Sequence, residues 1–258
     1  MLFDIRGRRK HVVRVVYAIL ALLMGASLFL VVGPFNIANL VGNSSTTSAG
    51  KLLVEQAERL ERKVLAEPDN EVLLGALTRT RISAGNALTV VSTETGAKTV
   101  SPEAHQEFEQ AAASWRRYLN QASTPSASIA ALMASAYFTL AESSSGLEAA
   151  EQNVAGAAAA QNVAAKTQPT VNSLTTLAIY EYYNGDFKAG DEAARKAEAK
   201  VPASEAKEVE KKMIEFRSRG KAFEQQKKEF AKQEREQGKE SLANPFGGLG
   251  GGSGSLGG

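Results

Sequence analysis

The chain contains no cysteine among its 258 residues, so it has no disulfide and no thiolate that could serve as a nucleophile or a metal ligand. Its two histidines, His11 and His105, are too few for a histidine-rich metal centre. It has no Walker loop and no nucleophile elbow, and the glycines near its C-terminus follow no predicted strand and precede no predicted helix. We therefore predict no catalytic, cofactor-binding or metal-binding residue, and a protein that is not an enzyme.

A strong charge imbalance is also absent, because the net charge of the whole chain is only +2. The first fifty residues hold 5 of the 30 Lys and Arg but only 1 of the 28 Asp and Glu. The remaining residues therefore carry 25 bases and 27 acids, a net charge of −2. A folded domain that binds nucleic acid needs a basic surface, so we exclude nucleic acid as a partner.

The most prominent feature that is present is an uncharged apolar run of eighteen residues, from Val15 to Val32. A helix of that length nearly crosses the ~30 Å hydrocarbon core of a bilayer. Basic residues at 6, 8, 9, 10 and 14 precede it, whereas residues 33–50 carry no charge. Because positive flanks stay in the cytoplasm, we predict a basic cytoplasmic stub (1–14), a transmembrane anchor (15–32) in the plasma (inner) membrane, and an extracytoplasmic remainder. A cleaved signal peptide is the alternative, although its apolar region is usually only about 7–15 residues long.

Helical periodicity dominates the extracytoplasmic remainder. Residues 33–50 are rich in Asn, Ser, Thr and Gly and predict a flexible linker. Beyond them, apolar residues recur every three or four positions, with Leu52, Leu65, Val72 and Leu132 among those expected to face inward. Prolines and capping residues divide this pattern into helices over about 51–66, 71–88, 102–121, 127–141, 147–167, 171–183 and 187–199, with a loop over 89–101. We predict an all-α fold of antiparallel helix pairs over 51–202, without strands.

Residues 171–202 carry a specific pattern, in which two amphipathic helices flank the turn Asn-Gly-Asp-Phe at 184–187. The large, small and turn residues of this unit are Leu174, Leu177, Ala178, Gly185, Asp186, Phe187, Gly190, Ala197 and Pro202. In their order and spacing they resemble the tetratricopeptide repeat (TPR), a helix pair of about 34 residues. The resemblance implies a TPR-like α-solenoid whose upstream units, over 126–169 and 52–121, are degenerate. An unrelated helical bundle is the alternative.

Residues 203–241 form one highly charged amphipathic stretch with helical periodicity. A seam of residues at alternating spacings of three and four consists of Val209, Met213, Phe216, Gly220, Phe223, Lys227 and Phe230. This seam predicts a C-terminal helix that caps the last repeat, with a dimerising coiled coil and a helix on the membrane surface as alternatives. Residues 242–258 are glycine-rich and predict a disordered tail.

The TPR resemblance implies a concave surface that binds a peptide or a partner helix. The candidate partner-binding residues are Tyr137, Asn172, Thr176, Tyr180 and Tyr183, although Tyr180 and Tyr183 could instead pack within the repeat. One anchor followed by an exported repeat domain resembles, in architecture, the TPR accessory subunit of the Sec translocon. We therefore expect a scaffold that contacts the bilayer through 15–32, uses no cofactor or metal, and binds protein or peptide partners in export or in an envelope complex. A homodimer joined through the C-terminal helix and an unrecognised envelope enzyme are the alternatives.

Overall fold

The computed structural model describes residues 44–91 and 98–237 of the chain. The predicted stub, the transmembrane anchor, the first part of the linker, the end of the C-terminal helix and the glycine-rich tail lie outside these residues. The chain divides into two compact units, Met1–Ala49 and Gly50–Gly258. In the part that the structure describes, no helix combines the length and the apolar composition needed to cross a bilayer.

The described residues form eight helices, which confirms the predicted all-α fold class. The helices are α2 (Ser44–Ala66), α3 (Glu71–Leu88), α4 (Pro102–Gln121), α5 (Ala127–Glu142), α6 (Leu147–Thr167), α7 (Val171–Tyr183), α8 (Phe187–Glu198) and α9 (Ala203–Gln237). The prediction of no strand was wrong in one detail, because β1 (Val90–Val91) and β2 (Lys98–Thr99) form a two-residue antiparallel ladder. Both strands lie within the predicted loop and contain β-branched residues, which favour extended backbone.

Local capping signals explain why several helices begin where the sequence predicts. The side chain of Asn70 accepts hydrogen bonds from the first backbone N–H groups of α3, and Ser101 accepts one from Ala104 at the start of α4. At the start of α7, Thr170 and Ser173 form a reciprocal capping box. These side chains satisfy N–H groups that have no partner within the helix, so each stabilises a helix start by about 1 kcal/mol.

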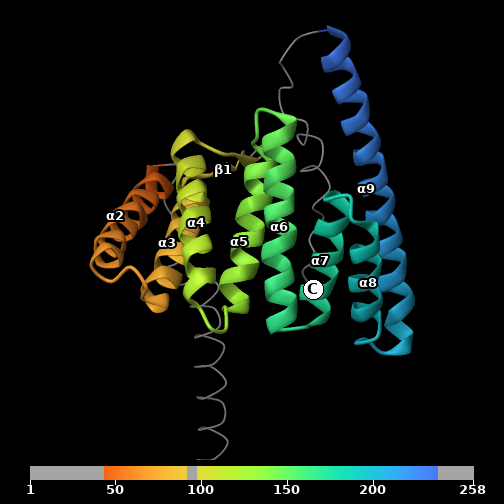
Figure 1. The fold of residues 1–258 in the computed structure, drawn as a ribbon, viewed down its shortest axis with the longest axis horizontal. Coiled ribbons are helices and arrows are strands. Elements are labelled where there is room, and N and C mark those ends of the chain that lie inside the picture. Colours follow the sequence, from red (N-terminus) through yellow and green to blue (C-terminus); the bar gives the residue numbers. More distant parts are fainter. Residues whose placement is uncertain (1–43, 92–97, 238–258) are drawn as a thin grey trace, which may run out of the picture. The chain divides into compact units, whose positions relative to one another are not determined.

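Three helix hairpins follow one another along the unit from Gly50 onward: α3 with α4, α5 with α6, and α7 with α8 (Figure 1). Helix α9 then packs against both α7 and α8. Glycines permit close approach within the hairpins, because a Cβ atom at Gly85 would lie 2.6 Å from the Phe108 ring. Gly190 of α8 lies against the Tyr182 ring of α7 in the same way. A glycine facing an aromatic ring thus sets the spacing in the first and the last hairpin.

The linker prediction was wrong over its last residues, because α2 begins at Ser44 rather than at Lys51. Gly50 of this helix packs against the Leu88 side chain of α3, a contact that the local sequence does not reveal. Within α2 the buried stripe is narrow: Ala57 and Val64 are fully buried, as predicted, whereas Leu65 is exposed.

Four apolar residues that were expected to face inward are in fact exposed. They are Leu52 and Leu65 of α2, Val72 of α3 and Leu132 of α5. The first three lie on α2 or in the first turn of α3, and the fourth lies on α5. Periodicity predicts which side of a helix is apolar, but the number of neighbouring helices decides how much of that side is buried.

Candidate functional site

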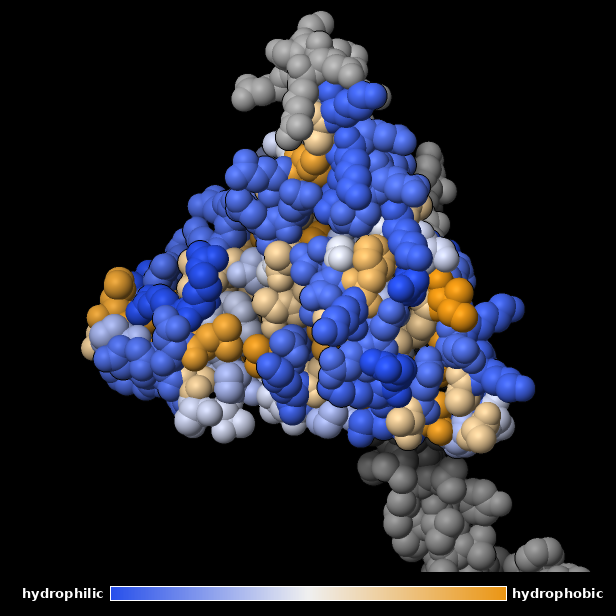
Figure 2. Space-filling view, turned by 45° about the vertical axis from the view of Figure 1, so that its right-hand side comes forward, coloured by the Kyte–Doolittle hydropathy of each residue, from blue (hydrophilic) through white to orange (hydrophobic). Residues whose placement is uncertain are grey.

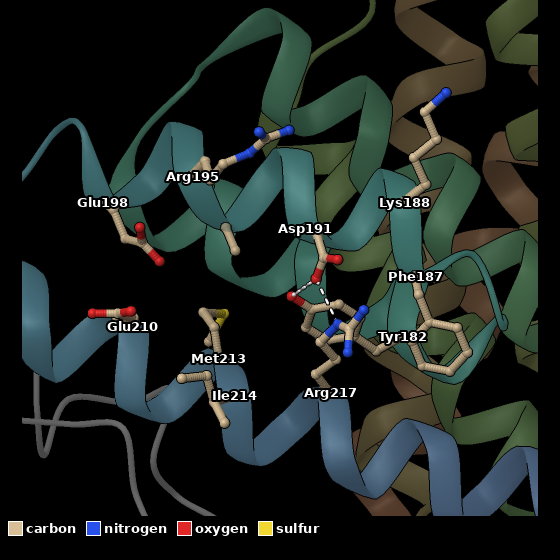
Figure 3. A pocket seen from close by; sticks show the side chains of 11 residues that line it. Tyr182, Phe187, Lys188, Asp191, Arg195, Glu198, Glu210, Met213, Ile214 and Arg217 are labelled. Atoms are coloured by element: carbon tan, nitrogen blue, oxygen red, sulfur yellow. Dashed lines mark hydrogen bonds and ion pairs between the residues drawn. The ribbon is translucent and has the colours of Figure 1, made fainter.

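A groove of about 710 Å³ opens between α8 and α9, and we call it the α8–α9 groove (Figure 3). Its volume lies within the range of about 300–1,000 Å³ that is typical of ligand sites. On the face shown in Figure 2, hydrophobic residues form small separate patches among hydrophilic ones. The groove is lined by Tyr182, Phe187, Lys188, Asp191, Ala194, Arg195, Glu198, Glu210, Met213, Ile214 and Arg217.

The turn between α7 and α8 positions one wall of the groove. Gly185 has a φ of 83°, in the left-handed region that glycine adopts without strain. The next residue, Asp186, caps α8 by accepting a hydrogen bond from the backbone N–H of Ala189. The turn therefore reverses the chain sharply, and α8 runs back along α7. Charged residues of α8 then face α9 across the groove.

Tyr182, Asp191 and Arg217 join three helices at one end of the groove (Figure 3). The Tyr182 hydroxyl donates to Asp191 Oδ1 at 3.1 Å, and Arg217 Nε donates to the same oxygen at 2.8 Å. The Arg217 guanidinium also lies 5.7 Å from the centre of the Phe187 ring. Burial, and then the hydrogen bond to Asp191, raise the pKa of Tyr182, so the phenol stays protonated and remains a donor. The charges of Asp191 and Arg217 are therefore paired with each other at this end of the groove.

The other end of the groove differs, because the carboxylates of Glu198 and Glu210 face each other across it (Figure 3). Partial burial and the neighbouring charge of Glu210 raise the pKa of Glu198, and Arg195 only partly offsets them. Within the described ranges 44–91 and 98–237, neither carboxylate forms an ion pair or a hydrogen bond. This end therefore carries a negative potential that the chain's described side chains leave largely uncompensated.

An apolar floor lies between the two ends. Ala194 and Met213 are nearly buried, whereas the Ile214 side chain is 58% exposed on α9. Isoleucine is among the residues most often found inside proteins, and the residues around Ile214 on α9 are mostly charged. The groove thus combines an apolar floor, a neutralised end and an acidic end.

The predicted partner-binding residues do not gather in this groove. Tyr183 is buried and packs against the Phe138 and Phe223 rings. Tyr180 stacks on Phe138 with the ring centres 5.1 Å apart, and burial raises its pKa to about 12. These two tyrosines pack within the helical body, which is the alternative that the sequence left open.

The remaining three candidates are divided between the interior and the surface. The Tyr137 ring lies against Gly156 of α6, and burial raises the pKa of its hydroxyl despite the nearby Arg116. Asn172 is exposed on α7, and Thr176 is half-buried there. Of these three, only Asn172 is exposed, whereas Tyr137 and Thr176 are both half-buried, and the binding role of all three stays a prediction.

Eight of the nine motif residues lie in the last hairpin, where they pack α7 on α8, make the turn or cap α8. Leu174, Leu177 and Ala178 of α7 and Ala197 of α8 belong to one buried cluster. Gly185 makes the turn, Asp186 caps α8, Phe187 stacks on Tyr182, and Gly190 lets α8 approach α7. Pro202 directly precedes α9.

Residues 44–91 and 98–237 contain no group of three or more His, Asp or Glu side chains arranged to hold a metal ion. The Nδ1 atom of His105 lies 3.7 Å from Glu109 on the exposed side of α4, and His11 lies outside the described residues.

Sequence reasoning missed the charged residues of the groove. Asp191, Glu198 and Glu210 lie on highly charged helices and match no motif, so the pattern predicts only a solvated face for them. Phe187 and Met213 carried a signal, through the turn motif of the last hairpin and the apolar seam of α9 respectively.

Comparisons with known proteins give no match for this chain. No protein family matches the chain, no curated protein is significantly similar to it, and no solved structure matches its fold.

Proposed function

We propose that the chain is a membrane-anchored, TPR-like scaffold that binds protein or peptide partners outside the cytoplasm, in protein export or in an envelope complex. The proposal combines the predicted anchor at 15–32 with the helical body that follows it. It assigns the body the role of a binding surface and assigns it no catalytic step.

The observation that supports the proposal best is the environment of the nine motif residues in the last hairpin. Eight of them have a packing, turn or capping role of the kind that their TPR-like positions imply, and the ninth, Pro202, directly precedes α9. The order of three hairpins followed by a packed C-terminal helix is consistent with a solenoid whose last repeat is covered. Helix pairs of this kind present side chains for partners on a rigid body rather than on loops.

The alternative of a dimer joined through the C-terminal helix is less well supported. Its seam residues Met213 and Phe223 are buried against the other helices of the same chain, and Gly220 lies against the Tyr182 backbone. The seam between Val209 and Lys227 is therefore already used within the chain. The mass of the full chain in detergent micelles distinguishes the scaffold from the dimer. The dimer requires two chains in each particle, whereas the scaffold can be a single chain.

Photo-crosslinking in intact membranes tests the proposed function. A benzophenone amino acid at Asn172 or Thr176 of the full chain is expected to capture extracytoplasmic proteins, identified by mass spectrometry. The same group at exposed Glu58 of α2 is the matched control and is expected to capture a different set or none. Ribosomal or nucleoid partners would show that both the topology and the function are wrong.

The predicted topology has a separate test. Alkaline phosphatase fused after Gly258 folds into an active enzyme only outside the cytoplasm, so we expect an active fusion. Inactive phosphatase, together with a fluorescent fusion protein at the same position, would place the helical body in the cytoplasm and overturn this part of the proposal.

A further inference from the structure

We infer that the α8–α9 groove binds a peptide segment of a partner protein that carries a lysine or arginine next to an apolar residue. The cation lies between Glu198 and Glu210, and the apolar side chain lies on Ala194, Met213 and Ile214. The inference rests on the proposed function and gives that scaffold a specific site and a partner of stated chemistry.

The first argument is electrostatic. At the neutralised end of the groove, Asp191 already receives hydrogen bonds from Tyr182 and Arg217. At the acidic end, Glu198 and Glu210 repel each other and form no ion pair with any residue in the described part of the chain. A bound cation would remove this repulsion and form charge-assisted hydrogen bonds to both carboxylates. An anionic segment would add to the repulsion and is therefore disfavoured.

The same chain shows a lysine in such a position elsewhere. Lys227 of α9 lies between two carboxylates, with its Nζ atom 2.9 Å from Glu151 of α6 and in contact with Glu224. Burial lowers the pKa of this lysine, but the two carboxylates raise it by more, so its net pKa is raised. The ammonium is also 5.5 Å from the centre of the Phe223 ring. Glu198 and Glu210 likewise come from two different helices, α8 and α9, and Arg195 of α8 only partly offsets their charge.

The second argument is the apolar floor beside the acidic pair. Ile214 exposes 58% of its surface directly beside the nearly buried Met213. An apolar side chain placed on them would remove its own surface and that of Ile214 from water, at about 25 cal/mol per Å². The groove volume of about 710 Å³ accommodates several side chains but not a folded domain. A short peptide segment fits this combination of volume, floor and charge.

The glycine-rich tail of the same chain is a poorer occupant. Residues 242–258 contain no lysine or arginine, so the tail offers no cation to the acidic end. A partner segment is therefore favoured over the tail.

Peptide binding to the full chain, held in nanodiscs, tests the inference. The probes are two short fluorescent peptides that differ only in a lysine or a glutamate beside two leucines, and binding is followed by fluorescence anisotropy. The chain is expected to bind the lysine peptide more tightly. The double variant Glu198→Gln and Glu210→Gln is expected to lower that affinity about fivefold or more, because it removes both charges while keeping the side-chain shape.

Matched control variants distinguish binding in the groove from a general effect of the chain's charge on affinity. Glu205→Gln with Glu229→Gln removes the same charge from exposed positions of α9 outside the groove and is expected to leave the affinity unchanged. Ile214→Asn is expected to weaken both peptides about fivefold, because it removes the exposed apolar part of the floor.

The inference is overturned if the lysine peptide binds no more tightly than the glutamate peptide, or if the groove and control variants change its affinity equally. Either result leaves the proposed function intact when crosslinking from Asn172 or Thr176 still captures extracytoplasmic partners. Conversely, selective binding in the groove together with ribosomal crosslinks would retain the site and reject the proposed cellular role.

Discussion

The first hairpin, α3–α4, and the last hairpin, α7–α8 with α9, use the same pair of charges in opposite ways. In the first, Arg81 and Glu107 are only 4% and 6% exposed and form two hydrogen bonds of 3.0 Å. In the last, Arg217 and Asp191 are 36% and 40% exposed and line a groove. An arginine–carboxylate pair thus organises the interior at one end of the chain and a surface site at the other.

The environment of Arg81 explains why its pair lies inside. Glu61 reaches it from α2 at 2.7 Å, so three helices meet at one guanidinium. Beside them, the Thr78 hydroxyl donates to Ser114 across the same hairpin. Buried charges are tolerated only when they are paired and hydrogen-bonded, and this set satisfies both conditions. Polar contacts in the interior therefore hold the first hairpin together, whereas small residues and a tight turn hold the last one together.

The largest effect should come from breaking the interior pair. Arg81→Met leaves the Glu107 carboxylate buried without its cation, and we expect the free energy of unfolding to fall by about 3–5 kcal/mol. Arg217→Met is the matched change in the last hairpin, and at its half-exposed site we expect a loss of no more than about 1 kcal/mol. Urea unfolding followed by circular dichroism measures both. Equal losses would contradict the comparison.

The double variant Arg81→Met with Glu107→Leu sharpens this result. Because it removes both charges and fills their space with apolar atoms, we expect it to recover most of the stability that the single variant loses. A double variant as unstable as Arg81→Met would mean that the pair is needed for more than mutual compensation.

A smaller loss of stability should come from changing Gly220, the glycine at which α9 closely approaches the backbone of α7. A Cβ atom at Gly220 would lie 2.6 Å from the Tyr182 carbonyl oxygen, and backbone cannot rotate away. We expect Gly220→Ala to cost about 1–3 kcal/mol, despite the better helix propensity of alanine. Gly75→Ala in the first hairpin meets only the Ile129 and Tyr118 side chains, at 3.1 and 3.2 Å, and should cost clearly less. Thermal unfolding of the two variants tests the difference.

A still smaller effect is expected from Tyr182→Phe. The change removes the hydroxyl that donates to Asp191, but Arg217 still donates to the same oxygen. We expect a loss of about 1 kcal/mol in urea unfolding. A loss of several kcal/mol would mean that the hydrogen bond from Tyr182 of α7 to Asp191 of α8 contributes more to stability than the salt bridge between Asp191 and Arg217 of α9.

The ionisation of Tyr180 should report its burial on α7. It should change stability only at high pH and not at neutral pH. The pKa of Tyr180 rises from an ordinary 10.0 to about 12, because burial and then the charge of Glu142 disfavour the phenolate. The unfolded chain loses this proton at lower pH than the folded chain, so stability falls as the pH rises from about 10 through about 12. Absorbance of tyrosinate at 295 nm, with and without denaturant, measures the shift. Identical titration curves would contradict the packing of Tyr180.

Much of the fold follows from signals within one helical turn. The predicted bounds of α3, α4, α6 and α7 agree with the structure, because capping residues such as Asn70 and Ser101 and prolines such as Pro102 act locally. Exposure was harder to predict: Leu132 lies on the expected apolar side of α5 but remains 39% exposed. The candidate site was not predictable, since Glu198 and Glu210 belong to different helices and face each other only after α8 and α9 have packed.

The sequence by itself determined the helical class, the bounds of α3, α4, α6 and α7, and the turn of the last hairpin at Gly185. These depend on backbone preferences and on contacts between near neighbours. Only the tertiary structure decided which charges are buried, as at Arg81, and which line a groove, as at Asp191 and Arg217. The reason is physical: the energy of a charge depends on what surrounds it, and its surroundings come from helices that lie far apart in the sequence.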